Sequence, residues 1–87
     1  MLTAKKKLNI IKKFRTHESD TGSPQVQIAI LTAEVADLTI HLREHKKDNS
    51  SRRGLISKVN ERRKLMKYLD REDPAALKTL KEALKLR

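Results

Sequence analysis

Residues 23–44 have the sequence SPQVQIAILTAEVADLTIHLRE, and this stretch decides the fold class. Its start carries two helix signals, because Ser23 can cap a free backbone N–H and Pro24 has no N–H to lose. The apolar residues that follow recur three, four, three and four positions apart: Ile28, Leu31, Val35, Leu38 and Leu42. That spacing places them on one face of a helix packed at a shallow angle against neighbouring helices. The sequence therefore predicts a long bundle helix over residues 24–44.

Three further helices are predicted, at about residues 4–15, 51–71 and 74–84. The last of them opens with Asp73-Pro74, a cap followed by proline, and three polar residues could cap the one before it: Asp48, Ser50 and Ser51. Short connections make successive helices antiparallel neighbours. We therefore expect an all-α fold of four helices in one domain, residues 1–87. Three of the helices form an antiparallel bundle, and the N-terminal helix packs across it or swings free.

The charge of the chain points to a polyanionic partner. Its 87 residues include 21 Lys and Arg against 11 Asp and Glu, a net charge of +10. Six basic residues lie in 1–17, and 43–71 holds eleven basic and four acidic residues. Such a surplus opposes compaction unless a polyanion relieves it, and nucleic acid is the commonest one. A membrane surface is the alternative, although no apolar run approaches the roughly 20 residues that span a bilayer.

Catalytic and metal sites are not indicated by the residues present. The chain has no cysteine, and His17 is distant from the pair His41 and His45. A zinc site needs three or four ligands, and only Asp48 could join that pair. No nucleophile stands beside a general base, and no glycine-rich phosphate loop is found. We therefore expect no enzyme activity, no cofactor and no metal site.

One face of the third predicted helix combines cations with an aromatic ring. Six residues share this face at helical spacing: Arg53, Ser57, Asn60, Lys64, Tyr68 and Arg71. An exposed tyrosine flanked by cations can stack on an unpaired base while the cations hold phosphates. A solvated charged face is the other interpretation of the helix, and the tyrosine could equally be a core residue with its hydroxyl at the edge. On the helix of residues 24–44, a polar stripe of Gln27, Glu34 and His41 could likewise be solvated or could read base edges.

Three sequence motifs resemble those of a known family. The first is HESDTGSPQVQIAILT at residues 17–32, and the second combines HL at 41–42, HKKD at 45–48 and SRRGL at 51–55. The third combines RRKL at 62–65 with YL at 68–69. Together they resemble the bacterial small-subunit ribosomal protein fifteen family, and the resemblance covers essentially the whole chain.

The resemblance implies a structural constituent of the ribosome that works without catalysis. Such a protein would bind 16S rRNA directly and early, at a three-way junction in the central domain. It would bridge the RNA helices there and help nucleate the platform of the 30S subunit. It would also meet 23S rRNA at a bridge between subunits and neighbour other platform proteins. The resemblance implies a cytoplasmic location, no membrane partner and a monomer when free.

The resemblance also assigns two RNA sites to residues of this chain. The junction site comprises Thr21, Gly22, Gln27, Tyr68 and Arg71. The second site, which reads a G·U/G·C motif in the minor groove, comprises His41, Asp48 and Ser51, with His45 adjacent. On charge and placement we add six phosphate contacts: Lys7, Lys46, Lys47, Arg52, Arg53 and Lys64.

The chain departs from the family pattern at a few positions. Asn49 and Ser50 stand where the family commonly has histidine, and Lys85 stands where it tends to have glycine. None of these departures removes a residue assigned to an RNA site. On the last helix we expect Lys81 to be exposed. A nucleoid-type DNA-binding protein is the runner-up, and it does not account for the loop around Gly22 together with residues 41–51.

Overall fold

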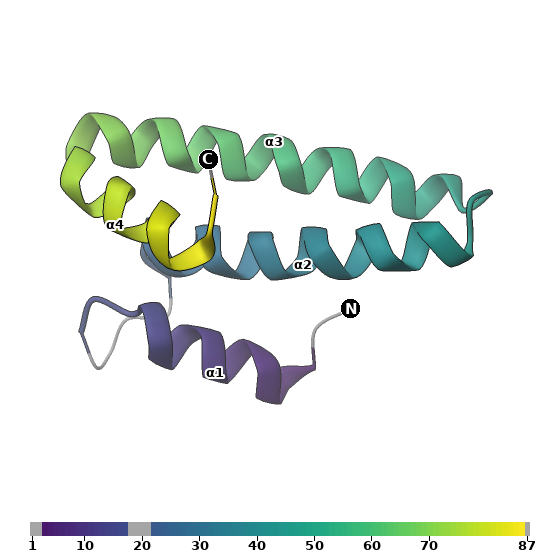
Figure 1. The fold of residues 1–87 in the computed structure, drawn as a ribbon, viewed down its shortest axis with the longest axis horizontal. Helices are drawn as coiled ribbons and strands as arrows, with labels where there is room; N and C mark the ends of the chain where they lie inside the picture. Colours follow the sequence, from purple (N-terminus) through teal and green to yellow (C-terminus); the bar gives the residue numbers. More distant parts are fainter. Residues whose placement is uncertain (1–2, 18–21, 87) are drawn as a thin grey trace.

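The computed structural model describes residues 3–17 and 22–86 of the chain, and these residues form helices without any strand. The elements are α1 (Ala4–Phe14), α2 (Pro24–Glu44), α3 (Asn49–Glu72) and α4 (Pro74–Leu84). Helices α2 and α3 lie side by side, α4 folds back beside them at one end, and α1 lies along the other side of α2 (Figure 1). The expected all-α class with four helices is confirmed, and α1 packs against α2.

Each helix starts at a residue whose side-chain oxygen accepts a backbone N–H. Thr3 accepts from Lys6, Ser23 from Val26 and Asp73 from Ala76, over 3.2, 3.3 and 3.1 Å. Pro24 and Pro74 occupy the first helical positions, where a missing N–H costs nothing. These local signals fix the starts of α2 and α4 where the sequence places them.

Helix α3 begins at Asn49, two residues before the expected start at residue 51. Its cap is Asp48, whose carboxylate accepts hydrogen bonds from both the backbone N–H and the hydroxyl of Ser51. Ser51 is therefore a partner of the cap and lies inside the first turn of the helix. The two carboxylate oxygens divide the task, because Oδ1 accepts from the N–H and Oδ2 from the hydroxyl.

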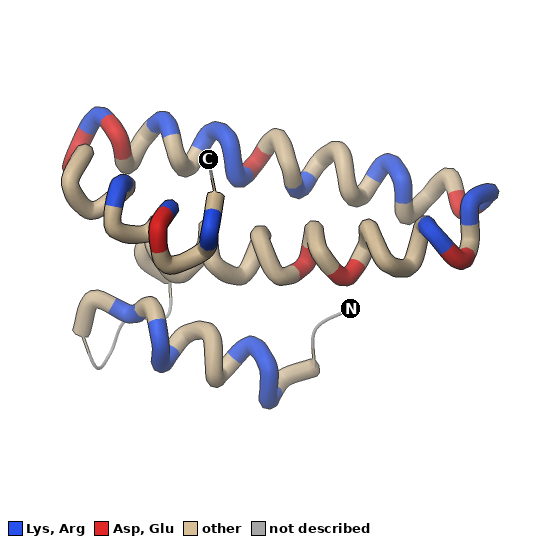
Figure 2. The backbone as a smooth tube through the Cα atoms, in the orientation of Figure 1, with Lys and Arg blue, Asp and Glu red and all other residues tan. Residues whose placement is uncertain are grey.

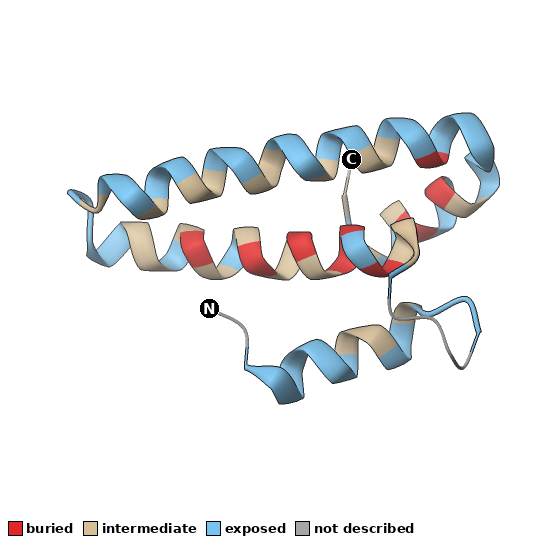
Figure 3. Ribbon diagram, turned by 180° about the vertical axis from the view of Figure 1, so that it is seen from behind, coloured by how far each residue is buried: buried red, intermediate tan, exposed pale blue. Residues whose placement is uncertain are grey.

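The core lies at the end of the molecule where all four helices meet. Four buried side chains form its centre: Ile28, Leu69, Leu77 and Leu80. Phe14 at the end of α1 packs against them, together with Leu65 and Met66 of α3. Figure 3 shows the buried positions along α2, on α4 and near the end of α3. Burying each such side chain stabilises the fold by roughly 1.5–3 kcal/mol.

Two large apolar residues of the α2–α3 pair are exposed. Ile40 on α2 is 55% exposed and Ile56 on α3 is 56% exposed. Both lie in the half of the helix pair that leads to the α2–α3 turn, which α4 does not cover. With only one neighbouring helix there, a helix can bury only one side of its apolar face.

An ion pair and a hydrogen bond, both partly buried, join α2 to α3. Glu34 on α2 is 8% exposed, and its Oε2 lies 2.9 Å from Nζ of Lys58 on α3. Near it, Nη1 of Arg62 donates to Oγ1 of Thr32 over 3.4 Å. The polar stripe expected on α2 is therefore not one solvated face, because Glu34 turns inward to meet a cation. No helix among the described residues is long and apolar enough to cross a membrane.

Candidate nucleic-acid interface

Three side chains predicted for the second RNA site meet at the α2–α3 turn. Nε2 of His41, near the end of α2, lies 2.7 Å from Oδ2 of Asp48. The hydroxyl of Ser51 donates to the same oxygen over 2.6 Å, and the backbone N–H of Ser51 donates to Oδ1 over 3.1 Å. We call His41, Asp48 and Ser51 the turn cluster. The fold brings together residues from two helices and the turn between them.

The hydrogen bonds within the turn cluster determine which of its groups can still donate or accept. They lower the pKa of Asp48 well below its usual range, the Ser51 hydroxyl contributing most and His41 next. An ionised carboxylate only accepts, so Nε2 of His41 and the Ser51 hydroxyl must both be donors. The remaining lone pairs of Asp48 and Ser51 stay available as acceptors. The turn cluster therefore offers a partner acceptor oxygens that are already held in place.

His45 borders the turn cluster at the end of α2. Its ring centroid lies 4.7 Å from that of His41, with the two planes tilted by 30°. Its backbone N–H donates to the His41 carbonyl, and its own carbonyl accepts from the N–H of Asp48. We expected His45 to be adjacent to this site, and its imidazole is exposed beside the turn cluster.

Exposed cations surround the turn. Lys46 and Lys47 belong to the turn itself, and Arg52 and Arg53 open α3. Nη2 of Arg52 donates to the Lys46 carbonyl over 2.7 Å, which ties the turn to the helix. Figure 2 shows this basic end of the molecule, and further Lys and Arg along α3 and α1. These four residues suit the phosphate contacts expected of them.

The opposite end of α3 carries the predicted aromatic platform. Tyr68 is 46% exposed, and the guanidinium carbon of Arg71 lies 5.8 Å from the centre of its ring. Lys64 is exposed one turn earlier on the same face. Arg71 also lies 3.8 Å from a carboxylate oxygen of Glu72, an exposed pair that contributes little. Tyr68 is therefore exposed and is not a core residue.

The loop before α2 supplies the other residues of the predicted junction site. The side-chain N–H of Gln27, on the exposed side of the first turn of α2, donates to the Gly22 carbonyl over 2.5 Å. Apart from its chain neighbours, no atom of the described residues lies within 4 Å of where a Cβ on Gly22 would stand. Thr21 lies outside the described residues. Lys7, the predicted phosphate contact on α1, is exposed.

The predicted residues form two groups rather than one site. Twenty positions of a single helix separate Ser51 from Arg71, which corresponds to about 30 Å at 1.5 Å per residue. The turn cluster therefore stands at one end of α3, and Tyr68 with Arg71 at the other (Figure 1). Among the described residues, no three His, Cys, Asp or Glu side chains converge as metal ligands would.

Sequence reasoning missed a second row of cations. Arg63 and Lys67 stand four apart on α3, on a different face from Lys64 and Tyr68. Their spacing indicates a shared helix face. The sequence does not show that α4 packs near that face. Lys81, expected to be exposed, is half-buried on the side of α4 that meets them.

Comparisons with known proteins agree with the motifs. The family model described as Ribosomal protein S15 matches residues 6–87. Over 86 residues the chain is 51% identical to the small ribosomal subunit protein uS15 of Staphylococcus saprophyticus, covering 99% of this chain and 97% of that one. The uS15 protein of Limosilactobacillus fermentum is 54% identical over the same length, with the same coverage. The resemblance noted in the sequence is thereby confirmed, and the chain belongs to the ribosomal protein S15 family.

Proposed function

We propose that the chain binds 16S rRNA at a three-way junction and holds the RNA helices there in one arrangement. As a member of its family it is a structural, non-enzymatic component of the small ribosomal subunit. The observation that carries the finer proposal is the placement of two preformed polar groups at opposite ends of one continuous helix, α3.

The turn cluster is suited to the minor groove of RNA. That groove is wide and shallow, and it displays 2′-hydroxyl groups and, at guanine, an amino donor. The free lone pairs of Asp48 and Ser51 would accept from these donors. Because Ser51 and His41 already donate to Asp48, an RNA acceptor such as adenine N3 meets no free donor from Ser51. We therefore expect the turn cluster to favour a guanine over an adenine.

The Tyr68 end is suited to the junction itself. Bases at a junction can be unpaired, and an exposed aromatic ring stacks on such a base with a gain of about 1–3 kcal/mol. Arg71 lies beside the ring and carries a guanidinium that can bind phosphate through two parallel hydrogen bonds. Gln27 and the Gly22 carbonyl, which are hydrogen-bonded to each other, are assigned to the same proposed site.

Holding both ends at once explains how such a protein would act without turnover. A branched RNA samples several angles between its helices, and only one angle lets both ends of α3 make contact. Binding shifts the population toward that angle by as much as the two arrangements differ in affinity. On the family resemblance alone, we extend the proposal to a contact with 23S rRNA and to neighbouring platform proteins.

Binding of purified variants to a transcript of the 16S rRNA three-way junction tests the proposal. We expect Ser51→Ala and Tyr68→Ala each to weaken binding by about tenfold or more, the loss of one hydrogen bond or one stacked base. The control is Lys78→Ala on α4, an exposed residue outside both sites, which should bind like wild type.

The same assay separates the proposal from DNA binding. Duplex DNA of equal length should compete poorly, because it offers neither 2′-hydroxyl groups nor an unpaired base. Preferential binding to the duplex, or equal losses in all three variants, would contradict the proposed function.

A further inference from the structure

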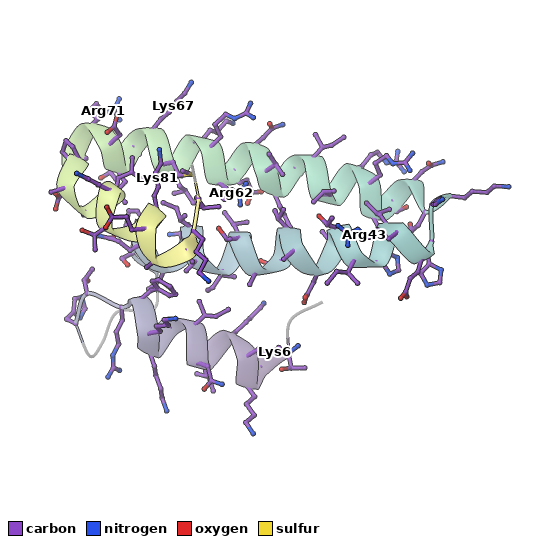
Figure 4. All side chains as sticks on the ribbon, viewed as in Figure 1. Lys6, Arg43, Arg62, Lys67, Arg71 and Lys81 are labelled. Atoms are coloured by element: carbon purple, nitrogen blue, oxygen red, sulfur yellow. The ribbon has the colours of Figure 1, made fainter. Side chains whose placement is uncertain are left out.

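A cleft between α3 and α4 lies apart from the two RNA sites. Four cations line it: Arg62, Arg63, Lys67 and Lys81, with Asp70 as the only carboxylate. The first three come from α3 and Lys81 comes from α4. Figure 4 labels three of them: Lys81 extends from α4 toward α3, Arg62 lies where α3 faces α2, and Lys67 extends outward from α3. We call this feature the basic cleft.

The basic cleft and the predicted junction site lie on different faces of α3. Arg63 and Lys67 precede Lys64 and Tyr68 by one residue each. One residue turns the chain by about 100° around an α-helix. A partner seated on Tyr68 and Arg71 therefore leaves the basic cleft open to a separate contact.

The cations of the basic cleft are not neutralised by the protein. Within residues 3–17 and 22–86, none of the four makes an ion pair with a carboxylate, Asp70 included. Arg62 is held by its hydrogen bond to Thr32 and is half-buried. Four cations around one carboxylate leave the basic cleft with a positive charge that attracts anions.

We propose that the basic cleft binds the phosphodiester backbone of RNA, as a third contact beyond the two base-reading sites. Guanidinium groups bind phosphate oxygens in pairs, and lysines add point charges. The inference rests on the proposed function for RNA as the partner. An acidic protein segment is the other polyanion that fits the charge. Its docking would call for exposed apolar anchors, whereas the apolar lining residues Val59, Met66 and Leu77 are partly or fully buried.

Salt dependence of RNA binding tests this inference with charge-matched variants. The cleft variant is Arg63→Gln/Lys67→Gln, and the control is Lys5→Gln/Lys12→Gln, two exposed α1 lysines assigned to no contact. Each lost phosphate contact reduces the slope of log Kobs against log salt by about 0.7–0.9. We expect the cleft variant to flatten that slope by about 1.5 relative to the control, with the preference for the junction transcript unchanged, because phosphate contacts carry no sequence information. Circular dichroism checks that both variants fold.

Equal slopes for the two variants would overturn the inference. So would normal RNA binding together with loss of binding to polyglutamate in the cleft variant alone, which would favour an acidic protein partner. Failure of the proposed function looks different, because wild type would then show no preference for the junction while the slopes could still differ.

A second experiment locates the contact directly. The chain has no cysteine, so Asp70→Cys gives a single attachment point for an iron chelate at the basic cleft. We expect hydroxyl radicals from that position to cleave the RNA backbone at places distinct from those cleaved from Glu72→Cys, beside Arg71 of the junction site, and from Glu44→Cys, near the turn cluster. Cleavage no greater than with untethered chelate would exclude a bound backbone in the basic cleft.

Discussion

Asp48 shows how one side chain can serve both the fold and the site. Its carboxylate caps α3 through the Ser51 N–H and also orients His41 and the Ser51 hydroxyl. The acceptor oxygens proposed to meet RNA are therefore positioned as soon as the helix forms. Little ordering remains to be done when RNA binds, which favours affinity.

Substitutions of Asp48 should separate these two roles. Asparagine is as good a helix cap as aspartate, so Asp48→Asn should unfold within a few degrees of wild type. It carries no charge and loses the two-donor arrangement at Oδ2, so affinity for the junction transcript should fall by about tenfold or more. Asp48→Ala should lose both stability and binding. Thermal unfolding by circular dichroism and filter binding measure the two effects, and equal destabilisation by both substitutions would contradict the division.

The lowered pKa of Asp48 predicts that part of the folding stability is lost at low pH. The hydrogen bonds hold its pKa in the folded chain below the ordinary value of 3.8. As the pH falls below that value, the unfolded chain takes up the proton first, so this stabilisation is present above about pH 4 and is lost below it. Wild type should therefore lose more stability than Asp48→Asn when thermal unfolding is compared at about pH 5 and about pH 2.5. Parallel losses would contradict the shift.

Lys85 ends α4 in a left-handed conformation, with φ 58° and ψ 37°. The N–H of Leu86 reaches the Lys81 carbonyl, closing the type of helix end that glycine usually provides. Lys85→Gly should stabilise the fold by about 0.5–1 kcal/mol, because the strain of a Cβ in this region exceeds the added entropy of glycine in the unfolded chain. Urea unfolding measures the gain. Lys85→Ala keeps the strain and should give no gain.

At the scale of the helices, one partly buried ion pair, between Glu34 and Lys58, joins α2 to α3. Removing one partner leaves the other charge without compensation, which costs more than the pair contributes. Glu34→Ala should lower the free energy of unfolding by about 2 kcal/mol, because Lys58 retains some exposure and can reach water. Glu34→Leu/Lys58→Met replaces both charges with apolar groups and should stay close to wild type. Urea titration of the three proteins checks this, and a double variant worse than Glu34→Ala would contradict it.

The helices were predictable from sequence to different extents. Local signals at Ser23 and Pro24, with the apolar spacing after them, were sufficient for α2. The start of α3 was not decided, because three nearby polar residues could each cap it. The inward turn of Glu34 could not be predicted either, since its partner lies 24 positions further along the chain. Whether an apolar side chain is buried depends on how the helices pack, and Ile40 stays exposed because no helix in the described part of the chain packs over it.

The candidate sites divide in the same way. The motifs marked His41, Asp48 and Ser51 individually, and the structure brings them into contact. Tyr68 was left between two interpretations, because helical spacing alone does not say which flank of a helix is covered. The basic cleft combines residues of two helices, so it could not be seen before the position of α4 was known.

At the scale of the whole molecule, the net charge of +10 governs binding to RNA. Six phosphate contacts are expected: Lys7, Lys46, Lys47, Arg52, Arg53 and Lys64. Releasing counterions at these six phosphates alone gives a slope of log Kobs against log salt of about −4 to −5, and contacts in the basic cleft would make it steeper. Measurement between about 50 and 200 mM KCl should therefore show a steep loss of affinity. A flat response would exclude an interface dominated by phosphates.

The molecule is elongated, with extents of 39 × 27 × 19 Å, and its long direction follows α2 and α3. The number of residues in these two helices therefore sets the distance between the two proposed RNA sites. Lengthening both by seven residues would add about 10 Å while turning the far end by only about 20°. Such a change would fit only an RNA whose stem between the two docking points had grown by the same length. The length of the helix pair and the length of that stem are therefore expected to vary together.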